Sequence, residues 1–225
     1  MTDKNLTEIV AIIDRSGSMQ SLVDDTIGGF NSFIEEQKKG VGKVLLSLVQ
    51  FDNYYQIDYE AKDINDVVQL DKSSYIPRGG TALFDAVART VNTVGARLAT
   101  TPEDQRPGTV IFLVITDGME NASNEFSKDQ VRDMVKHQIE KYNWEFVYMG
   151  GGDLETQKAQ GISLGIVANK VYAYSTDNGV GTKNLYRSVG SAFGRRMKAA
   201  SAGISFNASD SDMLNAEEVS SLLEK

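Results

Sequence analysis

The residues best suited to chemistry lie in a short loop directly after an apolar run. Ile9 to Ile13 is rich in β-branched residues and too short for a helix, which predicts a buried strand of a parallel sheet. The next residues, Asp14-Arg15-Ser16-Gly17-Ser18, supply one carboxylate and two hydroxyls. Oxygen donors gathered at the end of a buried strand are typical ligands of hard cations. A polar turn whose Asp and Ser cap the following helix is the alternative that this stretch alone leaves open.

Two later stretches carry side chains of the same kind. Val110 to Ile115 is a second buried-strand pattern that ends at an acid, in Thr116-Asp117-Gly118, and Arg78-Gly79-Gly80-Thr81 places a hydroxyl before a helical pattern. Together these stretches resemble the metal-ion-dependent adhesion site (MIDAS) of von Willebrand factor type A (VWA) domains, of the intracellular, bacterial or phage-like type. The family pattern is Asp-x-Ser-x-Ser, then a Thr, then an Asp in a later loop. It is matched in order by Asp14, Ser16, Ser18, Thr81 and Asp117.

The resemblance, which extends over about residues 8 to 200, implies a metal centre and a kind of partner. Carboxylates and hydroxyls are hard donors, which suit Mg²⁺ or Mn²⁺ and exclude metals that prefer thiolates. In the family the two Ser coordinate the ion directly, whereas the Thr and the two Asp do so directly or through water. A position stays open for an Asp or Glu of a partner protein. Intracellular members often serve large assemblies, such as AAA+ ATPase complexes, and a partner of this kind is what the resemblance suggests.

The rest of the chain alternates between strand and helix patterns. Asp52-Asn53 joins the second and third predicted strands in a hairpin, so the third should be an antiparallel edge strand. The alternation predicts an α/β fold: a doubly wound, mostly parallel six-stranded sheet in the order 3-2-1-4-5-6, with helices on both faces. In that order the first and fourth strands are neighbours, so Asp14 and Asp117 would meet at the edge where ligands bind. The predicted strands are 9–13, 43–51, 54–61, 110–115, 144–149 and 170–175, and the predicted helices are 20–38, 82–98, 127–142, 154–160 and 182–199.

Several other residues could contribute to function. Arg15 and Arg78 flank the metal loops and could steer an acidic partner, although a solvated charge is their more usual role. We expect Met119-Glu120-Asn121, which follow Asp117 closely, to line the rim of the metal site. Glu120 is not assigned as a ligand of the metal ion. Gly150-Gly151-Gly152-Asp153 could cradle a phosphate at a helix start, but it lacks the Lys and Ser/Thr of a P-loop and is interpreted as a plain turn. His137 lies beside the apolar face of its helix, which indicates a surface residue.

Composition narrows the classes of function. The chain has 225 residues, no cysteine, 41% hydrophobic and 24% charged residues, which is typical of a globular protein without disulfides or thiolate chemistry. A net charge of −8 without a basic stripe argues against nucleic acid as a partner. The sequence has no apolar run of about 18 residues and no signal-peptide core, so we expect a cytoplasmic protein that does not bind membranes.

The sequence supports an enzymatic function less well than a binding function. The single histidine is not part of a motif that also contains a Ser and an Asp, so the sequence does not indicate a nucleophilic triad. The main enzymatic alternative is Mg²⁺-dependent phosphotransfer with Asp14 as nucleophile. Such enzymes usually place a second Asp two residues later, where this chain has Ser16. We therefore predict a metal-dependent binding module that is not an enzyme, and a self-assembling structural protein is the third class left open.

The end of the chain differs from the rest. Residues 1–200 are predicted to form the VWA domain, and residues 201–225 an acidic, mobile tail whose five acidic residues and one lysine give −4 of the net charge. The alternative is a short helix near 215–224 that docks on the domain or on a neighbour. In a more specific form of this docking alternative, Asp210 or Asp212 enters the metal site of another copy of the chain. The apolar residues that favour a helix are Met213, Leu214, Val219, Leu222 and Leu223.

Overall fold

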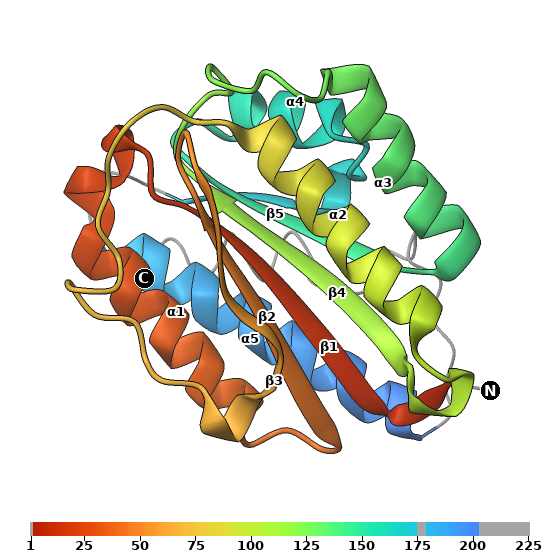
Figure 1. Cartoon of the computed structure of the whole chain (residues 1–225). Helices are drawn as coiled ribbons and strands as arrows, with labels where there is room; N and C mark the ends of the chain where they lie inside the picture. Colours follow the sequence, from red (N-terminus) through yellow and green to blue (C-terminus); the bar gives the residue numbers. More distant parts are fainter. Residues whose placement is uncertain (1, 175–178, 203–225) are drawn as a thin grey trace.

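A six-stranded sheet forms the centre of the computed structural model, which describes residues 2–174 and 179–202 (Figure 1). The strand order is β3-β2-β1-β4-β5-β6. β3 is antiparallel to β2, and the other neighbouring strands are parallel. The predicted fold class, strand order and antiparallel edge strand are therefore confirmed. The strands are β1 (Asp3–Asp14), β2 (Lys43–Phe51), β3 (Tyr55–Asp63), β4 (Pro107–Thr116), β5 (Glu145–Gly151) and β6 (Val171–Tyr174).

Helices cover both faces of the sheet (Figure 1). One core holds apolar residues of α1 and α5 together with Ile9, Ala11 and Ile13 of β1. The other core holds residues of α2 and α3 together with Val10 and Ile12 of the same strand. Because successive side chains of a strand point to opposite faces, a strand buried between two cores must be apolar throughout. The helices are α1 (Val23–Gln37), α2 (Leu83–Thr100), α3 (Lys128–Tyr142), α4 (Leu154–Ser163) and α5 (Gly179–Ser201).

The ends of several elements differ from the prediction. β1 begins at Asp3, before the apolar run, because its polar first residues still pair with β2 and β4. The predicted helix 20–38 begins as a short 3₁₀ helix, Gly17–Leu22, and becomes α-helical at Val23. β4 begins at Pro107, three residues before the predicted start at residue 110; the first residue of a strand is a position where a proline, which lacks an N–H donor, is tolerated. Other short 3₁₀ helices are Ile64–Asp66, Glu103–Gln105 and Ala168–Lys170.

The capping residues set the limits of α3 as expected. The Ser127 side chain accepts from the Gln130 N–H, and the Gln130 side chain accepts from the Ser127 N–H, which forms the predicted capping box. At the other end Asn143 adopts a left-handed conformation, with φ of 55°, and stops the helix.

The topology brings the two acidic strand ends to one edge. Ile13 of β1 pairs with Ile115 of β4, so Asp14 and Thr116 are the next residues on adjacent strands. The last described helix, α5, ends at Ser201, and the division into a domain of residues 1–200 and a tail stays a prediction. The predicted helix near 215–224 lies outside the described residues, and the mobility of the tail stays a prediction. None of the helices in the described ranges is long and apolar enough to cross a membrane.

Candidate metal centre

Asp14 is the buried anchor of the site. Its side chain has no exposed surface, and it stands at the last position of β1. The Ser16 N–H donates to its Oδ1 at 2.6 Å, and the Thr116 hydroxyl donates to its Oδ2 at 2.5 Å. The Tyr75 hydroxyl donates to the Asp14 backbone carbonyl at 2.6 Å. The bonds from Ser16 and Thr116 hold the carboxylate in one orientation and leave further lone pairs on both of its oxygens, while the bond from Tyr75 fixes the backbone.

A row of hydroxyls connects Asp14 to the second acid. The hydroxyl oxygens of Ser16 and Ser18 lie 3.1 Å apart. The Ser18 hydroxyl in turn donates to Asp117 Oδ1 at 2.7 Å. Ser16 is buried and Ser18 is exposed, so the row leads from the end of β1 to the surface. Two motif stretches that are about a hundred residues apart in sequence are thus in direct contact.

Gly118 shows where the remaining donors converge. A Cβ atom built on this glycine would lie 2.8 Å from Thr81 Oγ1, 3.3 Å from Ser18 Oγ and 3.4 Å from Asp14 Oδ2. Three oxygens from two loops, the one after β1 and the one before α2, therefore surround one point that only a glycine leaves free. All five predicted site residues belong to this cluster. In the described part of the chain, no group of three or more His, Cys, Asp or Glu could hold a metal ion. The side chains gathered in this cluster are two carboxylates and three hydroxyls.

The loop that carries Thr81 is fixed by backbone contacts. The Thr81 N–H donates to Asn121 Oδ1 at 2.9 Å, and its carbonyl accepts from the N–H groups of Asn121 and Ala122. Gly79 has a φ of +67°, and its carbonyl accepts from the Gly17 N–H at 3.0 Å. A Cβ on Gly79 would lie 2.3 Å from Asn53 Oδ1, so both the conformation and the space require glycine. Thr81 itself is buried, which fixes its hydroxyl in the site.

Two further carboxylates hold the loop between β4 and α3 against the start of α2. Asp85 accepts from the N–H groups of Asn124, Glu125 and Phe126 at 2.9 to 3.1 Å. Glu120 accepts from the Phe84 N–H of α2 at 2.9 Å and from N–H groups of its own loop. Glu120 is therefore bound to the loop and to α2, consistent with its not being assigned as a ligand. Sequence reasoning missed Asp85, although its place in the first turn of α2 is a typical position for an acid that binds backbone amides.

Burial disfavours negative charge at both acids of the site. The pKa of Asp14 rises to about 6, chiefly because the carboxyl is buried; the hydrogen bonds from Thr116 and Ser16 oppose this rise and the charge of Asp117 adds to it. Burial also raises the pKa of Asp117, against the hydrogen bond from Ser18. A cation placed between two such carboxylates would favour the ionised form of both.

Comparison with solved structures identifies the architecture. A von Willebrand factor type A protein from Catenulispora acidiphila matches with a TM-score of 0.53 and 15% identity, over 83% of this chain and 42% of that one. Proximal thread matrix protein 1 from the mussel byssus, solved with a zinc-occupied MIDAS motif, matches with a TM-score of 0.57 and 16% identity, over 84% of this chain and 46% of that one.

The chain has the VWA fold. The pilus adhesin SpaC from Lactobacillus rhamnosus GG also matches, with a TM-score of 0.62 and 11% identity over 85% of this chain and 31% of that one. The chain spans less than half the length of each of these three structures. No family model matches the sequence, and no curated protein matches it.

One prediction about the rim of this VWA fold is wrong. Arg15 is only 5% exposed, because its guanidinium lies against Asp52, with Nε 3.1 Å from Oδ2, and donates to Gln56 Oε1 at 2.8 Å. It is therefore neither a solvated nor a steering charge. Arg78 shares the same Asp52 oxygen at 2.8 Å, but its side chain is 57% exposed. Met119 is 58% exposed, which agrees with its predicted place on the rim.

The interpretations of the glycine run and of the histidine are confirmed. Gly152, with φ of +106°, leads into Asp153, whose carboxylate accepts from the N–H groups of Glu155 and Thr156 at the start of α4. This carboxylate takes up amides that a phosphate would need. Gly150 and Gly151 are the last residues of β5, so the turn itself consists of Gly152 and Asp153. His137 is an exposed residue of α3.

Proposed function

We propose that this chain is a divalent-metal-dependent protein-binding module. Its ion, Mg²⁺ or Mn²⁺, would be held by Asp14, Ser16, Ser18, Thr81 and Asp117. The observation that carries the proposal is the convergence of Thr81 Oγ1, Ser18 Oγ and Asp14 Oδ2 on one point beside Gly118. All donors are hard oxygens, which fit such ions.

The residues around the cluster support this role. Thr116 and the Ser16 N–H orient Asp14, so its remaining lone pairs are fixed before an ion arrives. Ser18 is exposed and Asp117 is partly exposed, so the cluster is accessible from solvent. A bound ion would offer a coordination position to a carboxylate. We therefore propose a protein partner that presents Asp or Glu, with exposed Arg78 attracting it over a longer range.

The comparisons support the choice of a divalent ion without deciding which one. The mussel protein, which shares the fold, has a zinc-occupied MIDAS motif. Because hydroxyl and carboxylate donors suit Mg²⁺ and Mn²⁺ better than Zn²⁺, we propose one of these two for this chain. An AAA+ ATPase complex stays an expectation for the assembly that the module serves.

A non-catalytic role is part of the proposal. A phosphotransfer nucleophile must reach the phosphorus of its substrate, but Asp14 has no exposed surface and each of its oxygens already accepts a hydrogen bond. Hydrolysis of an aryl phosphate in Mg²⁺ by the wild type, and not by Asp14→Asn, would overturn this part.

Metal binding is tested by calorimetry with Mn²⁺ on the wild type and Asp14→Asn. Loss of this carboxylate should weaken Mn²⁺ binding by at least the roughly 10- to 100-fold typical of outer-shell changes. The matched control is Asp153→Asn, which makes the same change at the same edge of the sheet, where Asn caps α4 as well as Asp does. Equal Mn²⁺ affinity in the wild type and Asp14→Asn would contradict the site.

Partner binding is tested by affinity capture with the same two variants, in Mg²⁺ and in chelator. A protein that uses the ion should be lost both with Asp14→Asn and with chelator, and retained by Asp153→Asn. If the captured proteins are the same in all conditions, the metal has no part in binding.

A further inference from the structure

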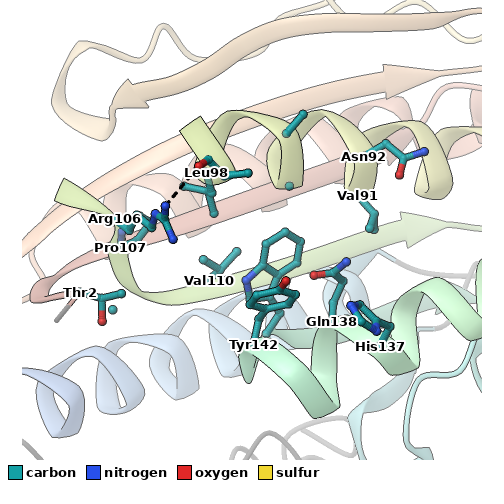
Figure 2. A pocket seen from close by; sticks show the side chains of 15 residues that line it. Thr2, Val91, Asn92, Leu98, Arg106, Pro107, Val110, His137, Gln138 and Tyr142 are labelled. Atoms are coloured by element: carbon teal, nitrogen blue, oxygen red, sulfur yellow. Dashed lines mark hydrogen bonds between the residues drawn. The ribbon is translucent and has the colours of Figure 1, made fainter. Parts of the chain in front are cut away.

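A groove at the opposite end of the sheet from the metal centre has no role in the proposed function. It lies between the ends of α2 and α3 and the start of β4, and has a volume of about 820 Å³ (Figure 2). Occupied pockets in proteins have volumes of about 300 to 1,000 Å³. Its floor consists of Val91, Leu98, Val110 and Trp144, all of them largely buried.

Small side chains on α2 keep the groove open. Asn92, Ala96 and Ala99 lie one helical turn apart on one face of α2, and all three are exposed. On the other side Tyr142 is 58% exposed, although its ring is next to that of Trp144, with the centroids 6.3 Å apart. The groove can therefore receive a row of apolar side chains without a change in the backbone.

The groove has a positive charge at one end. Among the described residues that line it, Arg106 is the one Lys, Arg, Asp or Glu. Its guanidinium donates to the carbonyls of Thr101 and Ala99 at 2.8 and 3.2 Å, and no carboxylate of the described ranges forms an ion pair with it. An acidic segment would complement this charge.

The segment after α5 starts at this end of the molecule. Arg196, near the end of α5, forms an ion pair with Glu145, the residue next to Trp144. Figure 1 shows the end of α5 at the same end of the sheet as the N-terminus and the start of β4. Residues 203–212 can span up to about 33 Å when extended. The two helix layers lie about 20 Å apart, since each packs about 10 Å from the sheet.

The sequence of this segment complements the groove. Ala216, Val219, Leu222 and Leu223 would share one face of a helix, with Glu217 and Glu218 beside it. We propose that residues 213–223 occupy the groove of their own chain, with this apolar face on the Trp144 floor and the acids towards Arg106.

Trp144 is the sole tryptophan of the chain, so it gives one indole N–H signal in NMR and one source of tryptophan fluorescence. The first test compares the wild-type chain of 225 residues with Leu222→Ser/Leu223→Ser, both free of metal. The double substitution should shift the indole signal and raise the acrylamide quenching constant of Trp144 at least twofold. Ser221→Ala, on the opposite face of the proposed helix, should change neither.

A second pair of variants tests the groove from its other side. Ala96→Glu should release the acidic segment by repulsion and give the same indole shift as the leucine substitutions. Ala96→Lys, of similar length and at the same exposed position, should retain the segment. An indole signal and a quenching constant that neither the leucine substitutions nor Ala96→Glu alter would overturn the proposal. A difference that disappears on dilution would also overturn it, because the segment would then come from a second copy.

Discussion

At the scale of single residues, the metal centre depends on Gly118 as much as on its ligands. In Gly118→Ala the methyl group would lie 2.8 Å from Thr81 Oγ1, in the space where the donors converge. We expect Mn²⁺ affinity to fall at least tenfold while the protein stays folded. Gly28→Ala is the control, because a Cβ there meets nothing within 4 Å. Unchanged Mn²⁺ affinity in Gly118→Ala, measured by calorimetry, would place the ion elsewhere.

Asp14 should also make the metal-free protein sensitive to pH. Its pKa is about 6 in the folded state against 3.8 for the unperturbed group, so the folded state favours the protonated acid. The resulting stabilisation is fully present below pH 4 and is lost as pH rises through about 6. In chelator, the melting temperature of the wild type minus that of Asp14→Asn should therefore decrease from pH 4 to pH 7. A difference that does not vary with pH would contradict the burial of this acid.

The five motif residues could be predicted because their types and order are visible along the chain. The residues that hold them in place could not be predicted. Thr116 and Tyr75 gain their roles only when folding brings them to the side chain and carbonyl of Asp14. Arg15 was assigned wrongly for the same reason. The Asp52 that buries it follows β2, 37 residues away, and no local pattern connects the two.

At the scale of elements, Asp85 links the first turn of α2 to the loop that follows β4. In Asp85→Ala three backbone N–H groups of residues 124–126 lose their acceptor. We expect the free energy of unfolding to fall by about 1 to 3 kcal/mol. Amide exchange in residues 119–126 should become faster and Mn²⁺ affinity should fall several-fold, because Asn121 of this loop positions Thr81.

Asp129→Ala is the matched control for Asp85→Ala. Asp129 lies in the first turn of α3, and its exposed ion pair with Arg132 should contribute less than about 1 kcal/mol. If both variants lose the same stability and exchange alike in residues 119–126, Asp85 does not hold the loop.

Hydrophobic periodicity predicts the central strands and the long helices well here because their apolar patterns are clear, whereas the edge strand β3 has no buried residue and a weaker pattern. β2 begins and ends where predicted, and the α3 capping box is visible in the sequence. The start of β1 could not be predicted in this way. Its polar residues from Asp3 onwards are held by pairing with β4, which a pattern of buried faces does not reveal.

At the scale of the whole molecule, a buried ionic cluster connects α5 to the sheet, away from the metal centre. Glu145 at the start of β5 receives Arg196 from α5 and Lys170 from the turn before β6, at 3.2 Å for the lysine. All three side chains are less than a tenth exposed. Burying these charges together is tolerable only while each keeps its partner.

Arg196→Met should therefore be strongly destabilising, by about 3 to 5 kcal/mol in urea denaturation, because Glu145 loses a buried partner. The control is Lys72→Met, since Lys72 and Asp24 form an ion pair with side chains 72% and 78% exposed, and its loss should cost less than about 1 kcal/mol. The Mn²⁺ affinity of folded Arg196→Met should equal that of the wild type, because the cluster lies at the amino end of β5 and the ligands follow the carboxyl ends of β1 and β4. A parallel fall in Mn²⁺ affinity, measured where the variant is fully folded, would show instead that the position of α5 and the metal centre are coupled.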